Sequence, residues 1–337
     1  MSIAPPDSRP MLDHVSWNVL TSTVKLTQFP MGEELVALAR RREDVVALTA
    51  DLASSNGLSE FRDTFPARFV NTGIAEQNMM SIAAGLASAG LTPYVSTFAS
   101  FASLLCAEQL RTDLAYTKMK VRILAHHAGV SMGFYGTSHH AVEDIAVTRA
   151  MGNMTVVSAA DGNAIRGLIR ATVDVDGPVY IRIGRGAEKP IYDEVPSFEP
   201  GRFFQLREGR DATIIATGIG VKAALDGADM LAADGVSIRV LDAAYLKPFD
   251  EAGVIAAAKQ TGVILTVEEH NPYGGLGSAV GDVLASSGLG VRFAKLALPD
   301  DYALVAPPTH LYRHYGLTGE GVVDKLRPLL ASLSEPA

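Results

Sequence analysis

One carboxylate stands at the start of a segment with almost no other charge. Residues 68–90, RFVNTGIAEQNMMSIAAGLASAG, place Glu76 between a polar turn and a run of Ala, Gly, Ser and Met. An acid in the first turn of a helix is ordinarily explained by the helix dipole. Here Asn71, Thr72 and Gln77 are polar yet lie close to apolar strand and helix, and small side chains allow another helix or subunit to approach closely. We therefore favour an interface helix that carries a functional acid over a solvated helix.

Four histidines bracket a glycine-rich loop, AHHAGVSMGFYGTSHH. His126 and His127 begin it, and His139 and His140 end it. Zinc ligands would share one helix face or be paired with acids or cysteines, so we expect no metal site. The loop follows an apolar strand, and α/β sheets bind ligands beyond the carboxyl ends of their strands. We therefore expect ligand contact or proton transfer from His127 and His139, and a structural role for the other two.

A glycine-containing turn, GIGVKAA at residues 218–224, matches a dinucleotide-binding pattern. It follows the strand ATIIATG and opens a helix, and Asp242 closes the next strand. Too few strands follow for a complete dinucleotide fold, and glycine suits any tight strand-to-helix turn. We favour a structural turn over a site for NAD.

Strands and helices alternate along the chain. The predicted strands are short apolar runs such as VVALTAD, TPYVSTF, VRILAHHAG and DATIIATG, with helical patterns between them. This alternation predicts an α/β fold of two domains, each with a mostly parallel sheet flanked by helices. We expect an N-terminal arm at 1–20, a first domain at 21–187, a linker rich in Pro, Gly and acids at 188–205, and a second domain at 206–337.

Composition limits the classes of function. The chain has 337 residues, 48% apolar and 20% charged, and a net charge of −8, which argues against nucleic acid or an anionic membrane as the partner. A single cysteine, Cys106, excludes a disulfide framework and a cysteine zinc site. Neither a signal peptide pattern nor an apolar run of membrane-spanning length is visible. We expect a cytoplasmic protein.

Several motifs, in the same order, resemble one family. NTGIAEQNM resembles a motif of transketolases and 1-deoxyxylulose-5-phosphate synthases, which use thiamine diphosphate. TPYVSTFASF is similar to the strand and turn that follow it, and the histidine segment resembles the family loop T-H-D-x-x-G-x-G-E-D-G-P-T-H-Q. LKPFD, TVEEH and GGLGS resemble parts of the C-terminal domain. The resemblance implies a pyrimidine-binding fold followed by a transketolase C-terminal-like fold.

The resemblance also implies a missing partner. The family's first domain, with a G-D-G and a later Asn that hold Mg²⁺ and the diphosphate, has no counterpart in this sequence. The chain thus resembles the C-terminal subunit of a split transketolase. A separate N-terminal subunit would complete the site and bind Mg²⁺ with most of its ligands. The implied assembly is α₂β₂. The implied reaction moves a two-carbon ketol unit from a ketose, expected to be phosphorylated, to an aldehyde.

The family assigns roles around the cofactor. Glu76 would hydrogen-bond to N1′ of the aminopyrimidine and promote the tautomer that removes the thiazolium C2 proton, which requires a shared proton in a dry pocket. Phe98 and Phe101 would form the aromatic platform for the same ring, the alternative being ordinary core phenylalanines. A third aromatic residue of the family falls at Leu104.

The family also assigns substrate contacts. His127 would touch substrate oxygens near the reacting carbon, and His139 would bind farther along. Arg185 and Ser55 fall where phosphate-binding residues lie, and a guanidinium suits phosphate geometrically. Asp51 matches an acid for which we expect an interface role.

Two departures concern the substrate. The acid that reads a substrate hydroxyl falls at Tyr135, and Phe134 replaces its neighbour; a second phosphate arginine is missing near Gln28. We therefore expect an altered donor or acceptor. The alternatives are a 1-deoxyxylulose-5-phosphate-synthase-like protein, a 2-oxo-acid dehydrogenase β-like subunit, or a non-catalytic scaffold derived from the family.

Overall fold

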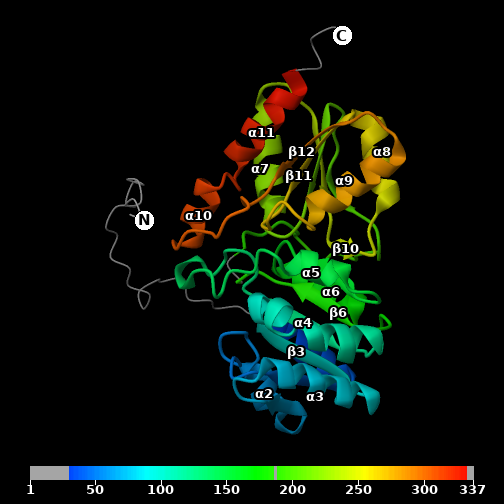
Figure 1. The fold of residues 1–337 in the computed structure, drawn as a ribbon, viewed down its shortest axis with the longest axis vertical. Coiled ribbons are helices and arrows are strands. Elements are labelled where there is room, and N and C mark those ends of the chain that lie inside the picture. The colour runs from blue at the N-terminus through cyan, green and yellow to red at the C-terminus, as the bar shows by residue number, and fades with distance from the viewer. Residues whose placement is uncertain (1–29, 186–187, 332–337) are drawn as a thin grey trace, which may run out of the picture.

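The computed structural model describes residues 30–185 and 188–331. Two sheets, each flanked by helices, follow one another along the chain (Figure 1). Both sheets are mostly parallel, which confirms the predicted fold class. The predicted arm at 1–20 and Gln28 lie outside the described residues. No described helix combines the length and hydropathy that a bilayer span needs.

The first sheet has seven strands in the order β10-β5-β6-β4-β3-β1-β2. All neighbours pair in parallel except β10, which runs antiparallel to β5. Most of these strands are buried along their whole length, as expected when helices cover both faces. Their bounds are β1 Val45–Thr49, β2 Phe69–Asn71, β3 Thr92–Phe98, β4 Arg122–His126, β5 Thr155–Ser158, β6 Val179–Arg182 and β10 Tyr245–Lys247.

Helices of the first half pack on this sheet. The α-helices are α1 Pro30–Arg41, α2 Ser59–Thr64, α3 Glu76–Ser88, α4 Ala107–Gln109, α5 Asp144–Ala150 and α6 Gly162–Thr172. The helical segment after β3 contains two π-helical stretches, η2 Phe101–Leu105 and η3 Leu110–Tyr116, on either side of α4. Two short 3₁₀ turns complete the set, η1 Pro66–Arg68 and η4 Gly133–Tyr135.

The second sheet has the order β12-β11-β8-β9-β7 and is parallel except for β7 at its edge. Its strands are β7 Phe204–Arg207, β8 Ala212–Ala216, β9 Ile238–Asp242, β11 Val263–Val267 and β12 Arg292–Leu296. The helices are α7 Gly220–Ala233, α8 Glu251–Thr261, α9 Leu276–Ser287, α10 Pro308–His314 and α11 Gly319–Ala331. In Figure 1 this half, yellow-green to red, stands above the blue-to-green first half.

Strand β10 joins the two halves. It comes from the second half of the chain, yet it completes the edge of the first sheet by pairing with β5 (Figure 1). Beside it, Lys247 Nζ donates a hydrogen bond to the carbonyl oxygen of Arg149 at 2.9 Å. The exact domain limits stay a prediction; β7 begins at Phe204, inside the stretch expected to be the linker.

Candidate active site

The carboxyl ends of β3 and β4 bring two predicted site residues together. Phe98 ends β3, and its register partner His126 ends β4. The next residue, His127, has a positive φ of 58°, which is uncommon outside glycine. This backbone conformation directs the His127 side chain away from the direction that it would have in a regular strand. The ring centroids of Phe98 and His127 are 4.4 Å apart, and both side chains are buried.

The histidine loop, residues 127–141, folds back onto these rings. Gly129 and Ala141 close its neck with two backbone hydrogen bonds of 3.0 and 2.9 Å. His139 therefore returns to the cluster: its ring centroid lies 5.6 Å from that of Phe98 and 5.4 Å from that of Phe101. Tyr135 stacks on His139 with centroids 4.8 Å apart. The loop thus gathers His127, His139 and Tyr135 over the two phenylalanines.

Arg185 adds the cationic group of the cluster. Its guanidinium carbon lies 4.8 Å from the ring centroid of Phe134, and the side chain is half-buried. Burial lowers the Arg185 pKa, an effect that Tyr135 opposes. Burial, together with His126, Arg185 and His139, lowers the pKa of His127 to about 2. His127 is therefore neutral near pH 7, as a hydrogen-bonding group beside a cation should be.

Glu76 is the first residue of α3 and is 6% exposed. Within the described part of the chain, no group donates a hydrogen bond to its carboxylate. Cys106 lies within its influence: burial, with a smaller contribution from Glu76, raises the pKa of that thiol to about 12. The carboxylate is therefore not committed to any other described residue.

The exposed residues that α3 and the end of η2 contribute beside Glu76 are uncharged. Ile74 is 85% exposed, and Leu104 and Leu105 also project into solvent. Gln77 Nε2 donates to the carbonyl oxygen of Leu105 at 3.1 Å, so the start of α3 and the end of η2 form one surface. The outward positions farther along α3 are equally uncharged: Gln77, Asn78, Ser81, Gly85 and Ser88.

Ser55 and Asp51 lie in the turn after β1. Ser55 Oγ donates to the carbonyl oxygen of Leu52 at 3.1 Å. Asp51, with a φ of 60°, exchanges hydrogen bonds with Asn71: its amide donates to Asn71 Oδ1 at 2.9 Å, and Asn71 Nδ2 donates to its carboxylate at 3.1 Å. The phosphate role of Ser55 and the interface role of Asp51 stay predictions.

Known proteins resemble this chain along most of its length. Residues 27–189 match the family model of the transketolase pyrimidine-binding domain, and residues 201–322 match that of the transketolase C-terminal domain. The chain belongs to the transketolase family. That family implies dependence on thiamine diphosphate and a transferase-type activity.

Individual relatives agree. This transketolase-family chain is 39% identical over 291 residues to one subunit of the apulose-4-phosphate transketolase of Phocaeicola vulgatus, covering 86% of this chain and 93% of that protein. It is 37% identical to the 1-deoxy-D-xylulose-5-phosphate synthase of Syntrophotalea carbinolica over 88% of this chain, but spans only 47% of that synthase. A solved split gene transketolase, an inactive β4 tetramer, matches with a TM-score of 0.81 and 40% identity, over 90% of this chain and 97% of that one.

The residues at the site fit the family's cofactor. Glu76 offers a largely buried side chain whose carboxylate has no hydrogen-bonding partner among the described residues, and Phe98 and Phe101 offer aromatic faces. Buried polar atoms near these rings also lack hydrogen-bond partners within the described chain, namely Thr97 Oγ1, Ser100 Oγ, His127 Nδ1 and Arg185 Nε. In the described residues, no group of three or more His, Cys, Asp or Glu side chains is arranged to hold a metal ion.

A buried ionic network beneath the histidine loop was not foreseen. Arg182 Nε donates to Asp144 at 2.9 Å, and the Tyr180 hydroxyl donates to the same carboxylate at 3.0 Å. Arg182 also lies 3.9 Å from the carboxylate of Glu269, in the second half of the chain. The one sequence feature that could have indicated Glu269 is its position in TVEEH, where two acidic residues follow a buried strand.

The dinucleotide pattern has a structural role. Gly218 has a φ of 55°, and a Cβ at Gly220 would lie 2.7 Å from the carbonyl oxygen of Val267. Asp242 is fully buried and accepts a hydrogen bond of 2.6 Å from the Tyr192 hydroxyl. The glycines therefore serve the turn and close packing, and the acid is not available to a ribose.

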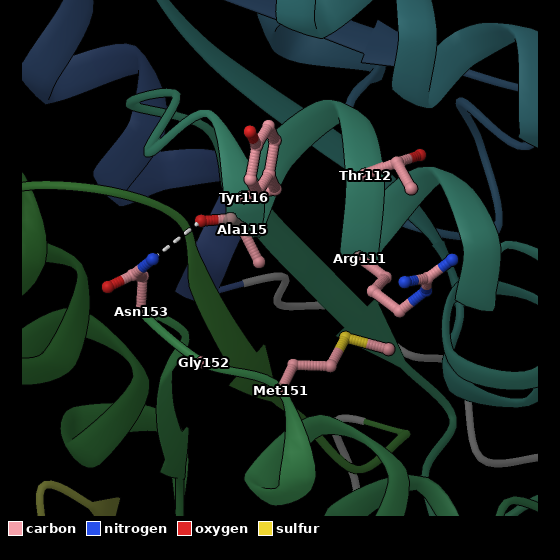
Figure 2. Close-up of a pocket in the computed structure, with 7 residues that line it drawn as sticks. All are labelled: Arg111, Thr112, Ala115, Tyr116, Met151, Gly152 and Asn153. Carbon is pink, nitrogen blue, oxygen red and sulfur yellow. Dashed lines mark hydrogen bonds between the residues drawn. The ribbon is translucent and has the colours of Figure 1, made fainter.

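The first half of the chain also contains a surface hollow. Figure 2 shows it between η3 and the turn after α5, lined among others by Arg111, Tyr116 and Met151, with a volume of about 440 Å³. Asn153 Nδ2 donates to the carbonyl oxygen of Ala115 across one side of it at 3.0 Å. None of the predicted site residues lines this hollow, and Arg111 is paired with Glu108, so we assign it no chemistry.

Proposed function

We propose that this chain is the C-terminal subunit of a two-subunit, thiamine-diphosphate-dependent transketolase. It moves a two-carbon ketol unit from a ketose, expected to be phosphorylated, to an aldehyde acceptor. The observation that carries the proposal is Glu76, whose side chain is largely buried, has no hydrogen-bonding partner among the described residues and lies beside exposed apolar side chains. A site half-built in this way is completed by another polypeptide and a cofactor.

The proposed partner is a separate N-terminal subunit that holds Mg²⁺ and the diphosphate, in an α₂β₂ assembly. The exposed apolar side chains of Ile74, Leu104 and Leu105 support a protein contact beside Glu76, because such groups gain by leaving water. The Phocaeicola vulgatus relative is named as one subunit of its enzyme, which is in line with this division. The cytoplasmic location expected from the sequence stays a prediction.

Glu76 is proposed to hold a proton in a hydrogen bond to a ring nitrogen of the cofactor. The chemistry that bound thiamine diphosphate supplies is addition of a nucleophilic carbon to a carbonyl group and temporary storage of the two-carbon unit. Phe98 and Phe101 keep water from the reacting centre and provide flat contacts. Removal of such a proton-transfer group ordinarily costs about 10²- to 10⁴-fold in rate.

The substrate side divides into a neutral and a cationic part. His127, with its pKa lowered to about 2, is proposed to donate or accept hydrogen bonds with substrate oxygens rather than to carry charge. Arg185, placed over Phe134, is proposed to bind a phosphate or another anionic group, and His139 to contact the chain between them. Tyr135, stacked on His139, stands where the family has an acid and supports an altered donor or acceptor.

The test is reconstitution with the N-terminal subunit and a panel of donors. Ketose phosphates and hydroxypyruvate should donate a two-carbon unit to aldehydes, and Glu76→Ala should abolish transfer. Full activity of Glu76→Ala would instead support a non-catalytic scaffold. The similarity to a 1-deoxyxylulose-5-phosphate synthase favours a second candidate, and CO₂ release from pyruvate would identify that class or the 2-oxo-acid dehydrogenase class.

A further inference from the structure

The histidine loop is held by the second half of the chain at several points. Asn271 donates its amide to the carbonyl oxygen of Val142 at 2.9 Å, at the exit of the loop. The amide of Ala306 donates to the carbonyl oxygen of Gly133 at 3.2 Å, at the tip. These are backbone contacts, which many side chains would permit. The third contact, at the neck, is made by a single side chain.

That side chain is Glu269. Its carboxylate accepts a hydrogen bond of 2.8 Å from the backbone amide of Val130, three residues after His127. It is 2% exposed, and it lies so close to the neck that a Cβ at Gly129 would be 2.0 Å from its carboxyl carbon. Gly129 has a φ of 61°, so glycine serves there both for the conformation and for this approach.

The other groups around Glu269 orient it. Arg182, from β6, has Nη1 3.9 Å from the carboxylate and donates from Nη2 to the Glu269 carbonyl oxygen at 2.8 Å. The same Nη2 donates to the carbonyl oxygen of Ala141, at the other side of the neck, at 3.2 Å. Tyr312, from α10, and Glu188 also face the carboxylate. Burial raises the pKa of Glu269 to about 7, against the opposing effect of Arg182.

We propose that Glu269 is a positioning residue of the second domain that fixes the neck of the histidine loop, and so the places of His127 and His139. It touches neither substrate nor cofactor. The Glu269 carboxylate accepts a hydrogen bond from the Val130 amide, and Arg182 donates one to the carbonyl oxygen of Ala141. Arg182 and Glu269 in turn contact each other. Both strands of the neck are thereby tied to the buried pair of Arg182 and Glu269, which favours the arrangement of the loop in which the two histidines meet Phe98.

The consequence for catalysis rests on the proposed function, but the positioning itself does not. Removing the acceptor leaves a buried amide donor without a partner, which shifts a local opening equilibrium by roughly tenfold or more. The neighbouring Glu268 provides a matched control. It is equally buried, but its carboxylate accepts from the amides of Leu276 and Gly277 at 2.7 Å each, at the start of α9 and away from the loop.

The first experiment is hydrogen–deuterium exchange of the full-length chain alone, comparing Glu269→Ala and Glu269→Gln with Glu268→Gln. We expect exchange in segment 128–142 to rise about tenfold in Glu269→Ala and less in Glu269→Gln, which keeps an oxygen acceptor. Segment 122–126 should be unchanged in both. Glu268→Gln should leave segment 128–142 as in the wild type and affect α9. Unchanged exchange in 128–142 for both Glu269 variants, or an equal rise in Glu268→Gln, overturns the proposal.

The second experiment uses the reconstituted complex. Glu269→Gln should lower kcat/KM for the sugar donor by about tenfold or more, while the dissociation constant of thiamine diphosphate changes by less than about threefold, because the loop holds substrate-side groups. An equal loss in cofactor affinity would identify a merely structural role. If the complex carries no transketolase activity at all, the exchange experiment still decides the positioning claim. The two failures are therefore distinguishable.

Discussion

The imidazole of His127 lies 4.4 Å, centroid to centroid, from the phenyl ring of Phe98, at the carboxyl ends of adjacent parallel strands. The contact links a residue proposed to bind substrate to one proposed to bind the cofactor. The contact depends on the positive φ of His127, because this conformation breaks the alternation of side-chain directions that β4 would otherwise continue. Around this pair the histidine loop adds His139 and Tyr135.

Glu76→Gln should remove activity from the reconstituted enzyme by about 10²-fold or more, because the amide cannot share a proton with a ring nitrogen. The thermal stability of the chain should be nearly unchanged, since the Glu76 carboxylate has no hydrogen bond to lose within the described chain. Steady-state rates and thermal unfolding check the two parts. Glu199→Gln, at an exposed position, is the control and should keep full activity.

His127→Asn should weaken the acid sensitivity of folding. The folded-state pKa of His127, about 2, lies below the ordinary value of 6.5, so below pH 6.5 the unfolded chain binds a proton that the folded chain does not. Stability contributed by the neutral imidazole is present above that pH and is lost as pH falls. Between pH 7 and pH 5 the loss in unfolding free energy should be smaller in the variant, by about 2 kcal/mol.

Urea titrations at the two pH values measure this difference in unfolding free energy, and asparagine tolerates the positive φ. An identical pH dependence in variant and wild type would contradict the assignment.

Glu269→Gln should have the opposite pH signature. The folded-state pKa of Glu269, about 7, is raised above the ordinary value of 4.5, so the folded chain keeps a proton that the unfolded chain releases. Its contribution to stability is present at low pH and is lost as pH rises through 7. The variant should reduce the fall in unfolding free energy between pH 5 and pH 8 by on the order of 1–3 kcal/mol. Glu199→Gln should leave the curve unchanged; no difference between Glu269→Gln and wild type would refute the shift.

Tyr135→Asp should move the donor preference toward ordinary pentose phosphates. The substitution restores the acid that reads a substrate hydroxyl in the family, and a hydrogen bond to a charged group changes discrimination by roughly 10- to 100-fold. Relative kcat/KM values across a ketose panel measure the effect. Tyr135→Phe, which keeps the ring that stacks on His139, separates loss of the hydroxyl from gain of the acid. Unchanged relative rates in Tyr135→Asp would show that this position does not select the substrate.

The parallel strands could be predicted from the sequence because each is a continuous apolar run buried along its length, as β3 and β4 are. Strands β7 and β10 were missed. Both are short edge strands that pair antiparallel, and β10 pairs with β5 across almost ninety residues of chain. The β10 pairing is decided by the packing of the two halves, and the β7 pairing with β9 lies within the second half; no local pattern reports either.

For the candidate site, position along the chain was more informative than residue type. The place of His127 beyond a buried strand indicated ligand contact, but neither that place nor the family resemblance predicted that Phe98 would contact both His127 and His139. The contact between Glu269 and Val130 was not predictable, because the two residues are separated by 139 positions and the acid lies in another domain. Sequence periodicity carries no information on such pairs.

The most direct test of the account is two-carbon transfer from labelled hydroxypyruvate to an aldehyde, measured for each subunit alone, for the complex with the N-terminal subunit, and for the complex carrying Glu76→Gln. The account predicts a labelled ketose from the wild-type complex with thiamine diphosphate and Mg²⁺, none from either subunit alone, and at least about a 10²-fold lower rate from Glu76→Gln. Transfer at the wild-type rate by the Glu76→Gln complex would contradict it.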